Sequence, residues 1–363
     1  MNPHFPEIKK NFGFGLMRLP KTEDGSINDK EVERMIGDFL AMGFNYFDTA
    51  APYHNGDSEG VVYRELSSKY PRNSYLLADK LSPTCFETEE DILPFFEGQL
   101  KKCGVEYFDF YLMHANSAER HEKFTRTRAY DIAQELKAQG KIRHVGMSFH
   151  DSAAVLDKIL TDRPEMEFVQ IQFNYADYED PDVESRACYE VCRKHGKPVI
   201  VMEPVKGGSL VNLPQEALDL MDKTPVNYAI RFAAGFEDVV MVLSGMSDES
   251  QLLENLKFMK DFKPLNEEEQ EMLKKVRTIY QAQNKIPCTA CRYCVDGCPA
   301  GIPIPELFAF ANEKHKKDPK PEGAYSDFEV NGSACLDCGK CEAECPQHLH
   351  IRKLLQDIHK EFA

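Results

Sequence analysis

Residues 29–47 read D-K-E-V-E-R-M-I-G-D-F-L-A-M-G-F-N-Y-F, an amphipathic stretch (Asp29–Ala41) followed by a short apolar run (Asn45–Phe47). Apolar side chains in the first part recur three and four positions apart, which predicts a helix with one buried face. The apolar run after it is typical of a strand that is buried on both faces. A helix joined to a buried strand is the unit from which parallel sheets are built.

The same alternation continues up to about residue 262. Further apolar runs, each expected to form a strand, are Phe14–Leu16, Tyr75–Ala78, Phe108–Met113, His144–Met147, Phe168–Ile171, Val199–Met202 and Val239–Leu243. Helical periodicity recurs in Ser58–Lys69, Glu89–Lys102, Tyr130–Gln139, Ala153–Leu160 and Pro181–Lys194. Eight strand–helix units in about 250 residues predict an α/β fold, a closed (β/α)8 TIM barrel over residues 1–264. An open doubly wound sheet is the alternative, but it would carry a glycine fingerprint after its first strand, and none is present there.

Two cysteine runs dominate the C-terminal part. The first holds Cys288, Cys291, Cys294 and Cys298 before Pro299, and the second holds Cys335, Cys338, Cys341 and Cys345 before Pro346. Each matches the C-x2-C-x2-C-x3-C-P run that binds a [4Fe–4S] cluster, in which the fourth cysteine usually reaches the other cluster. The spacing therefore predicts cluster A on Cys288, Cys291, Cys294 and Cys345, and cluster B on Cys335, Cys338, Cys341 and Cys298. Zinc sites and disulfides are the alternatives, and zinc typically uses well-separated cysteine pairs.

The segments around these cysteines are expected to be helical. Residues 265–284 begin with an Asn cap and an acidic first turn, which predict a connecting helix. Pro303–Asn312 and Ile351–Ile358 have the apolar spacing of two further helices. Residues 285–363 are therefore predicted to form a small α-helical dicluster ferredoxin-like domain.

The composition excludes several classes of partner. The formal net charge is −16, which argues against nucleic acid because phosphate binding needs basic patches. No apolar run approaches the 18 or so residues that span a bilayer, so we expect no membrane partner. The N-terminus shows no basic start followed by an apolar stretch. Cysteine-rich sequence without such a signal indicates a cytoplasmic protein with metal-bound thiolates.

Polar residues stand where the predicted strands end, and in such a barrel the active site lies at those ends. Asp48 and Tyr53 follow one strand, Lys80 follows the next, and His114 follows a third. Lys80, held by Asp48, would stabilise a Tyr53 phenolate and lower the pKa of this tyrosine. His114 would orient a carbonyl oxygen while Tyr53 donates the proton and a hydride arrives on the carbonyl carbon. The four residues predict a catalytic tetrad.

Over most of residues 10–262 the sequence resembles the aldo-keto reductase family. The resemblance is carried by residues 43–50 (G-F-N-Y-F-D-T-A) with Tyr53, by 109–114 (D-F-Y-L-M-H), by 140–148 (G-K-I-R-H-V-G-M-S), and by Gln170–Tyr175. It implies that Asp48, Tyr53, Lys80 and His114 are catalytic. It also implies nicotinamide contacts at Ser148 and Gln172, and adenosine contacts at Ser244, Gly245, Ser247, Gln251, Glu254 and Asn255. The whole chain looks like an aldo-keto reductase fused to a ferredoxin-type domain.

Two departures from the family bear on the nucleotide. Met202 stands where many members place an aromatic ring that stacks on the nicotinamide. The stretch 244–251 (S-G-M-S-D-E-S-Q) contains two acids and no cation, where NADP-using members hold the 2′-phosphate with Lys or Arg. Lys206, on the facing loop, is the candidate substitute. We therefore expect NADH or NADPH as cofactor, with NADH favoured.

The two halves of the chain imply different electron counts. Hydride transfer moves two electrons, whereas a [4Fe–4S] cluster normally passes one. Three interpretations remain open: a flavin or flavoprotein partner that splits the pair, clusters that only stabilise the fold, or clusters that feed a substrate in the tetrad pocket. No flavin fingerprint is visible. We favour an iron–sulfur oxidoreductase acting on a small carbonyl or alcohol. The alternative is an electron-transfer or docking module in which the barrel positions the ferredoxin tail.

Overall fold

The computed structural model describes residues 4–283, 286–315 and 323–363. Its centre is a closed barrel of parallel strands in chain order, with β1 hydrogen-bonded to both β2 and β8. The strands are β1 (Phe12–Gly15), β2 (Tyr46–Asp48), β3 (Leu76–Leu81), β4 (Phe108–Asn116), β5 (Ile142–Phe149), β6 (Val169–Gln172), β7 (Val199–Met202) and β8 (Val239–Gly245). The predicted (β/α)8 barrel is confirmed.

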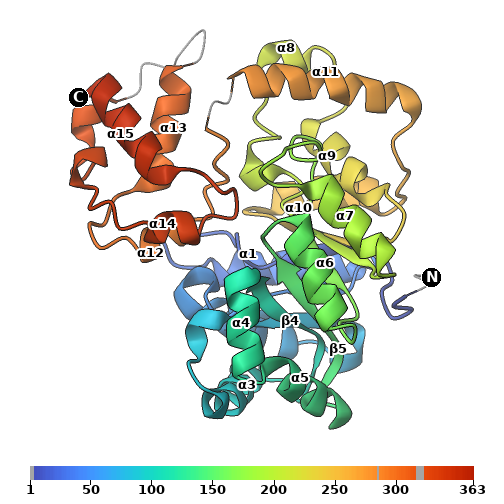
Figure 1. Cartoon of the computed structure of the whole chain (residues 1–363). Helices are drawn as coiled ribbons and strands as arrows, with labels where there is room; N and C mark the ends of the chain where they lie inside the picture. Colours follow the sequence, from blue (N-terminus) through green and yellow to red (C-terminus); the bar gives the residue numbers. More distant parts are fainter. Residues whose placement is uncertain (1–3, 284–285, 316–322) are drawn as a thin grey trace.

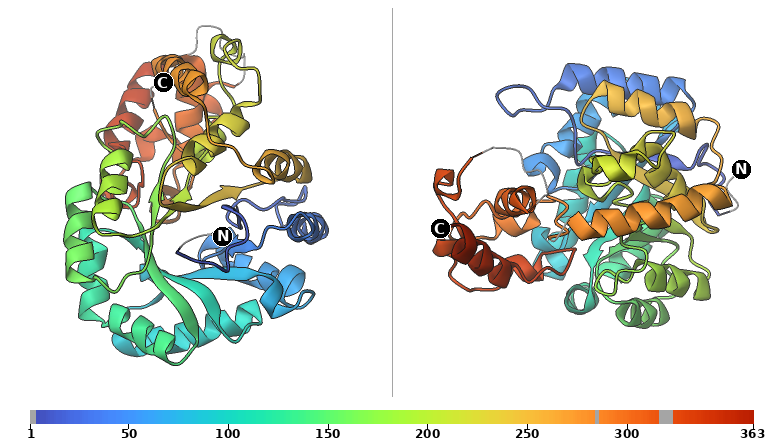
Figure 2. Two further views of the ribbon diagram at one scale, coloured as in Figure 1. Left: turned by 90° about the vertical axis from the view of Figure 1, so that its right-hand side faces the viewer. Right: turned by 90° about the horizontal axis from the view of Figure 1, so that it is seen from above.

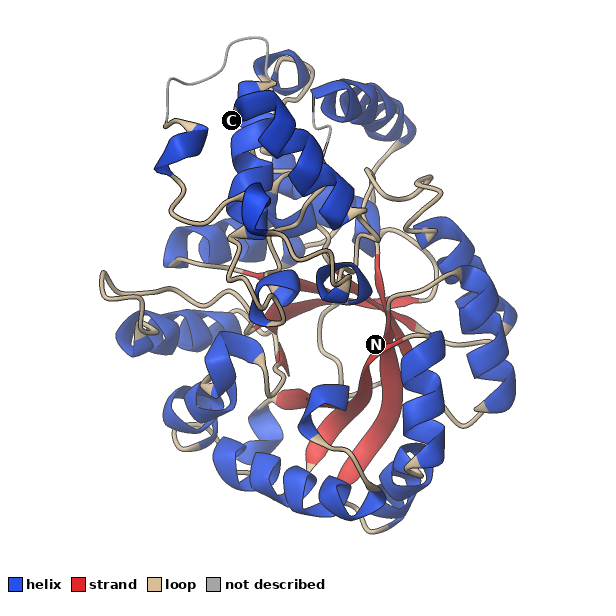
Figure 3. Ribbon diagram, turned by 60° about the vertical axis from the view of Figure 1, so that its left-hand side comes forward, coloured by secondary structure: helices blue, strands red, loops and turns tan. Residues whose placement is uncertain are grey.

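Helices surround the strands, as Figures 2 and 3 show. Those of the barrel are α1 (Asp29–Ala41), α2 (Ser58–Val61), α3 (Glu89–Cys103), α4 (Ala118–Arg126), α5 (Ala129–Ala138), α6 (Ala153–Asp162), α7 (Ser185–Lys194), α8 (Gln215–Leu218), α9 (Pro225–Ala234) and α10 (Glu249–Met259). The helix predicted over Ser58–Lys69 is α2 continued by π-helical turns to Ser67. The boundaries of α1 agree with the prediction, because Asn28 caps its first turn by accepting a hydrogen bond from the Glu31 backbone.

Two apolar layers hold the barrel together. The outer layer lies between strands and helices, and the inner layer fills the barrel with side chains such as Tyr46, Phe110, Phe168 and Leu243. Gly13 is needed in the inner layer, because a Cβ atom there would lie 2.7 Å from the Leu243 side chain. The interior is therefore a packed core, and an open cavity can form only at a barrel end.

Helix α11 (Glu267–Gln283) links the barrel to the C-terminal domain. Its buried face, Leu273, Val276 and Tyr280, packs on barrel residues that include Leu210 and Tyr228. Figure 1 shows α11 running past α8 and α9. This packing joins the connecting helix to the barrel. The predicted end of that helix at residue 284 lies outside the described residues.

The C-terminal domain contains α12 (Tyr293–Asp296), α13 (Ile304–Lys314), α14 (Lys340–Ala343) and α15 (Ile351–Phe362). Its own apolar core includes Leu307 and Phe308 of α13 and Leu355 of α15. The helical character of the predicted small domain is confirmed, and Figure 1 shows it beside the barrel in orange and red. Among the described helices, none is long and apolar enough to cross a membrane.

Candidate active site and cluster sites

A cavity of about 410 Å³ opens at the C-terminal ends of the strands. It is lined by all four residues of the predicted tetrad. Asp48 ends β2, whereas Lys80 and His114 lie within the last residues of β3 and β4. We expected both to follow their strands, but parallel pairing of β3 with β4 and of β4 with β5 extends these strands beyond the apolar runs.

The Lys80 ammonium is the centre of the tetrad. Its Nζ atom lies 2.5 Å from Oδ1 of Asp48, 3.1 Å from the Tyr53 hydroxyl and 2.8 Å from the Thr49 carbonyl oxygen. Lys80 is 1 % exposed, so its charge is held by these three acceptors rather than by water. A buried ammonium with a paired carboxylate and a phenol at its side can stabilise a phenolate when the phenol loses its proton.

The pKa of Tyr53 differs from our expectation. Burial and the Asp48 charge raise the pKa of Tyr53 well above its ordinary value, and a hydrogen bond with Tyr293 partly offsets that rise. The expected net lowering of the Tyr53 pKa is wrong, because burial of the phenol and the Asp48 charge outweigh the neighbouring Lys80 ammonium. Tyr53 is therefore a protonated phenol at neutral pH, which suits a proton donor.

His114 is neutral in this environment. Burial and the nearby Lys80 charge lower the pKa of His114 well below its usual value. Its Nδ1 atom lies 2.6 Å from the Ser82 hydroxyl, and its ring packs edge-on against Tyr53 at 6.1 Å. If the Ser82 hydroxyl donates to Nδ1, the other ring nitrogen carries the proton and can donate to a substrate oxygen.

The cavity also brings together nine of the ten predicted nucleotide contacts. They are Ser148, Gln172, Met202, Ser244, Gly245, Ser247, Gln251, Glu254 and Asn255. Lys206 is not among the lining residues. It is 2 % exposed, and its ammonium pairs with the buried Asp177 and donates at 2.6 Å to Gln347. The structure thus places Lys206 in a buried network instead of on the cavity surface.

Gln172 belongs to the same network. Its amide nitrogen donates to Asp177 at 2.7 Å, and its amide oxygen accepts from Nε2 of Gln347 at 2.8 Å. Gln347 comes from the C-terminal domain and is 4 % exposed. Both polar atoms of Gln172 are therefore engaged, one of them by a residue that follows Cys345-Pro346.

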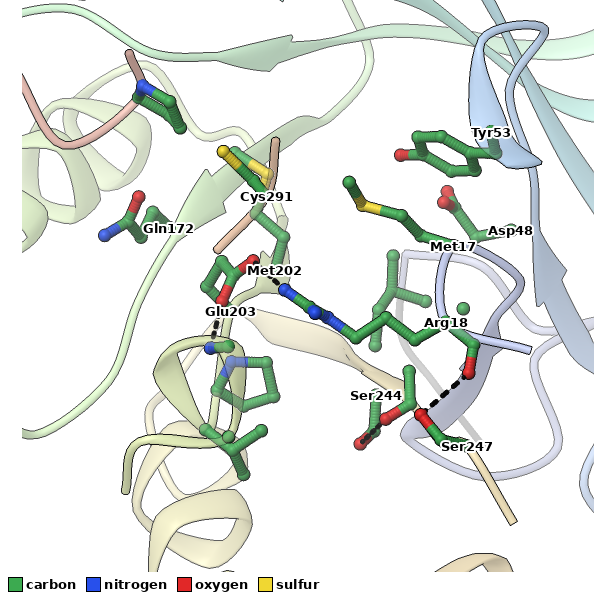
Figure 4. Close-up of a pocket in the computed structure, with 18 of the residues that line it drawn as sticks. Met17, Arg18, Asp48, Tyr53, Gln172, Met202, Glu203, Ser244, Ser247 and Cys291 are labelled. Carbon is green, nitrogen blue, oxygen red and sulfur yellow. Dashed lines mark hydrogen bonds and ion pairs between the residues drawn. The ribbon is translucent and has the colours of Figure 1, made fainter. Parts of the chain in front are cut away.

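Arg18 lines the cavity and was missed in the sequence. It lies in the loop after β1, where its carbonyl oxygen accepts from the Ser247 hydroxyl at 3.1 Å. Its side chain extends across the cavity toward Glu203, 3.9 Å away (Figure 4). It also donates at 3.0 Å to the carbonyl oxygen of Thr289 in the C-terminal domain. No motif surrounds Arg18, so only its position after the first strand could have drawn attention to it.

The expected adenosine end is held by hydrogen bonds at the start of α10. Asp248 caps this helix by accepting from the Gln251 backbone, and it also accepts from the Gln251 side chain at 2.7 Å. Arg34 of α1 reaches this end of the barrel, but it pairs with Glu249 at 3.4 Å. A phosphate placed here would meet the Asp248 carboxylate and a cation that already has a partner.

The eight predicted cluster ligands fall into two groups. Cys288, Cys291, Cys294 and Cys345 surround one small pocket, and Cys298, Cys335, Cys338 and Cys341 surround another. These are the two ligand sets that the spacing predicts, with the fourth cysteine of each run exchanged. All eight are free thiols, so the donor sets fit two [4Fe–4S] clusters held by four thiolates each. No disulfide joins any of these eight cysteines in the structure.

Family models match the chain in two consecutive parts. The model of the aldo/keto reductase family matches residues 11–278, and the model of the 4Fe-4S dicluster domain matches residues 287–349. A closed parallel barrel with a polar cavity at its strand ends is the architecture of an α/β enzyme. The chain belongs to the aldo/keto reductase family and carries a C-terminal 4Fe-4S dicluster domain.

Individual relatives are distant. An aldo-keto reductase of Mycolicibacterium smegmatis is 31% identical over 33% of this chain and 41% of its own length. The NAD/NADP-dependent indole-3-acetaldehyde reductase of Schizosaccharomyces pombe is 26% identical over 41% of this chain and 49% of its own. The chain thus spans less than half of these curated relatives.

Solved structures support the barrel over a longer range. The holo form of aldo-keto reductase AKR11C1 from Bacillus halodurans has a TM-score of 0.60 and 22% identity, covering 73% of this chain and 91% of that one. The NADPH complex of an aldo-keto reductase from Klebsiella pneumoniae has a TM-score of 0.60 and 17% identity, covering 74% and 90%. At these identities the likeness shows the fold alone.

Proposed function

We propose that this protein is an NAD(P)H-dependent oxidoreductase that interconverts a small carbonyl compound and its alcohol. The contact of the buried Lys80 ammonium with both Asp48 and Tyr53 carries this proposal. The ammonium stabilises the phenolate that forms when Tyr53 gives up its proton, whereas burial opposes ionisation of the phenol. Membership of the aldo/keto reductase family and relatives named as reductases support it.

The chain's own residues account for the proton transfer. NAD(P)H, when bound, supplies the hydride. Tyr53 donates its proton to the carbonyl oxygen, and Lys80 stabilises the phenolate that remains. His114 donates a hydrogen bond to the same oxygen, which stabilises the negative charge that develops there. In the oxidation direction the same groups act in reverse, with the Tyr53 phenolate as base.

The nucleotide contacts belong to this proposal. Ser148 and Gln172 would hold the carboxamide, and Ser244, Gly245, Ser247, Gln251, Glu254 and Asn255 would line the adenosine half. We propose that NADH binds at least as well as NADPH, because Asp248 adds negative charge at the 244–251 end and Arg34 is already paired with Glu249.

The eight cysteines would hold two clusters, which carry single electrons when present. Cys291 lines the same cavity as Tyr53, so a cluster held by Cys291 would lie beside the proposed active site. This observation favours redox-active clusters over purely structural ones. A docking module in which the barrel only positions the tail is the second candidate, and the complete tetrad weighs against it.

The test compares Tyr53→Phe with Tyr63→Phe in anaerobically purified holoprotein. Tyr63 is an exposed barrel tyrosine and serves as the matched control. We expect Tyr53→Phe to lower aldehyde reduction by about 10²–10⁴-fold, with iron content and nucleotide binding unchanged. Near wild-type turnover of Tyr53→Phe would overturn the proposal.

A further inference from the structure

The C-terminal domain contacts the barrel at the cavity itself. Side-chain hydrogen bonds join them: Arg18 to the Thr289 carbonyl at 3.0 Å, Gln347 to Gln172 at 2.8 Å, Arg120 to Glu344 at 2.7 Å, and Lys206 to Gln347 at 2.6 Å. The first two involve barrel residues that line the cavity. The domain therefore docks on the strand ends, where the proposed chemistry takes place.

Thr289 shows how closely the two parts fit. It is 2 % exposed, and its carbonyl oxygen faces Gly207 in the loop after β7. A Cβ atom at Gly207 would overlap that oxygen, so only glycine allows this approach. The backbone just before Cys291 therefore packs closely against the Gly207 loop at the edge of the cavity.

Tyr293 follows directly from this docked segment. It lies between the cluster A ligands Cys291 and Cys294 and begins α12. Ala290 and Arg292, on either side of Cys291, both adopt left-handed backbone conformations (φ 52° and 69°), which few non-glycine residues do. This strained turn directs Tyr293 into the cavity, which it lines together with Tyr53, Lys80 and His114.

Tyr293 also contacts the proposed proton donor. A side-chain hydrogen bond with Tyr293 lowers the pKa of Tyr53 against the larger effect of burial, and the Lys80 ammonium donates to the Tyr53 hydroxyl at 3.1 Å. A donor aimed at the Tyr53 oxygen leaves the proton of Tyr53 free to point at a substrate. The Tyr293 ring, half-buried beside Cys291 and Pro346, forms a wall of the same cavity.

We propose that the cluster domain completes the barrel's active site, with Tyr293 as a positioning residue for Tyr53 and as the wall that limits substrate size. This inference rests on the proposed function for the role of Tyr53. The role of Tyr293 as a cavity wall stands on the geometry alone. The active site is then shared between two domains, and the ligand loop of cluster A contributes one of its side chains.

The test uses Tyr293→Phe and Tyr293→Ala, with Tyr63→Phe as control and iron and sulfide assayed in each. The probes are propanal and 4-nitrobenzaldehyde for turnover, and 4-nitrobenzyl alcohol for calorimetric binding without nucleotide. Tyr293→Phe should lower kcat for both aldehydes about fivefold, the loss of one hydrogen bond, with KM within twofold. Tyr293→Ala should change the ratio of kcat/KM for the two aldehydes at least threefold and change the Kd of the alcohol by a similar factor.

The outcomes separate the two proposals. Wild-type kinetics and an unchanged Kd in both variants would overturn the inference. Equal loss with both aldehydes together with loss of iron would also overturn it, because Tyr293 would then only support the cluster. If Tyr53→Phe keeps full turnover, the proposed function fails. The Kd of 4-nitrobenzyl alcohol in Tyr293→Ala still tests whether Tyr293 forms a wall of the cavity. In a Tyr53→Phe background, Tyr293→Phe should have no further effect on the residual rate.

Discussion

Gln347 of the cluster domain donates its side-chain amide to Gln172 of the barrel at 2.8 Å, and both residues are at most 5 % exposed. Gln172 is the residue expected to hold the carboxamide of a nicotinamide. The side chain of Gln347 is itself a carboxamide, so it engages Gln172 with the functional group that the nucleotide would present. If Gln172 holds the nicotinamide carboxamide as proposed, nucleotide binding competes with this contact inside the chain.

Replacing Gln347 should strengthen nucleotide binding. Gln347→Ala leaves Gln172 and Lys206 with free hydrogen-bonding atoms beside the cavity, while the domain stays docked through Arg18 and Arg120. We expect the Kd for NADH and NADPH to fall three- to tenfold, about 0.7–1.4 kcal/mol, in calorimetric titrations. Gln356→Ala, at an exposed position in the same domain, is the control. Weaker or unchanged binding in Gln347→Ala would show that the amide pair does not compete with the nucleotide.

Nucleotide preference follows from the charges around α10. Gln251→Arg places a guanidinium where Gln251 now bonds Asp248 and the Ser247 backbone. A charge-assisted hydrogen bond to a 2′-phosphate contributes about 1.5–3 kcal/mol, so we expect a shift toward NADPH of at least tenfold. Binding of both nucleotides to the wild type, to Gln251→Arg and to the exposed control Gln139→Arg measures this. A wild type that already prefers NADPH tenfold would contradict the NADH expectation and direct attention to Arg18.

Gly207 tests the docking of the two domains. Gly207→Ala puts a methyl group against the Thr289 carbonyl, whereas Gly208→Ala meets no atom within 4 Å. Both glycines have positive φ, so the pair separates the clash from backbone strain. We expect Gly207→Ala to cost about 1–3 kcal/mol more than Gly208→Ala, measured as a larger fall in Tm of the holoprotein. Equal Tm values for the two variants would mean that the contact between the Gly207 loop and the Thr289 carbonyl does not contribute to the stability of the protein.

Glu269 links α11 to the barrel in a pH-dependent way. Its hydrogen bonds with Arg231, together with those of Asn266 and Lys223, lower the pKa of Glu269 to about 2. A carboxyl with a depressed pKa contributes its full stabilisation at pH values above its ordinary pKa of 4.5. This stabilisation is lost as the pH falls toward the folded-state pKa of about 2. Glu269→Gln should cost about 1–2 kcal/mol at pH 7, and the difference from wild type should shrink below pH 4.5. Denaturant unfolding at several pH values measures it, with the exposed Glu268→Gln as control; a difference that grows in acid would contradict the assignment.

The tetrad was predictable because it depends on local pattern. Apolar runs located the strands, and polar residues at their ends located Asp48, Lys80 and His114 within a few residues. The cysteine spacing likewise predicted both ligand sets. These features are encoded over short stretches of sequence, so they do not depend on how distant parts of the chain meet.

Arg18, Gln347 and Tyr293 were not predictable on the same basis. Their proposed roles depend on the docking of residues 286–315 and 323–363 on the barrel, which joins positions 271 residues apart in the Arg18–Thr289 bond. The aromatic Tyr293 between two ligand cysteines was the available signal, but a ligand loop can also carry an aromatic residue for packing. Lys206 was expected at the nucleotide because the buried Asp177 that pairs with it could not be recognised as its partner.

Hydride is proposed to reach a carbonyl carbon in the cavity that Tyr53 lines. The most direct measurement follows deuterium from NADH or NADPH labelled at C4 during reduction of 4-nitrobenzaldehyde by anaerobic holoprotein, with both C4 epimers tested. We predict deuterium on the alcohol carbon with one epimer, at a rate lowered about 10²–10⁴-fold in Tyr53→Phe and unchanged in Tyr63→Phe. Alcohol formed without deuterium from either epimer, or at an equal rate in Tyr53→Phe, would contradict the claim.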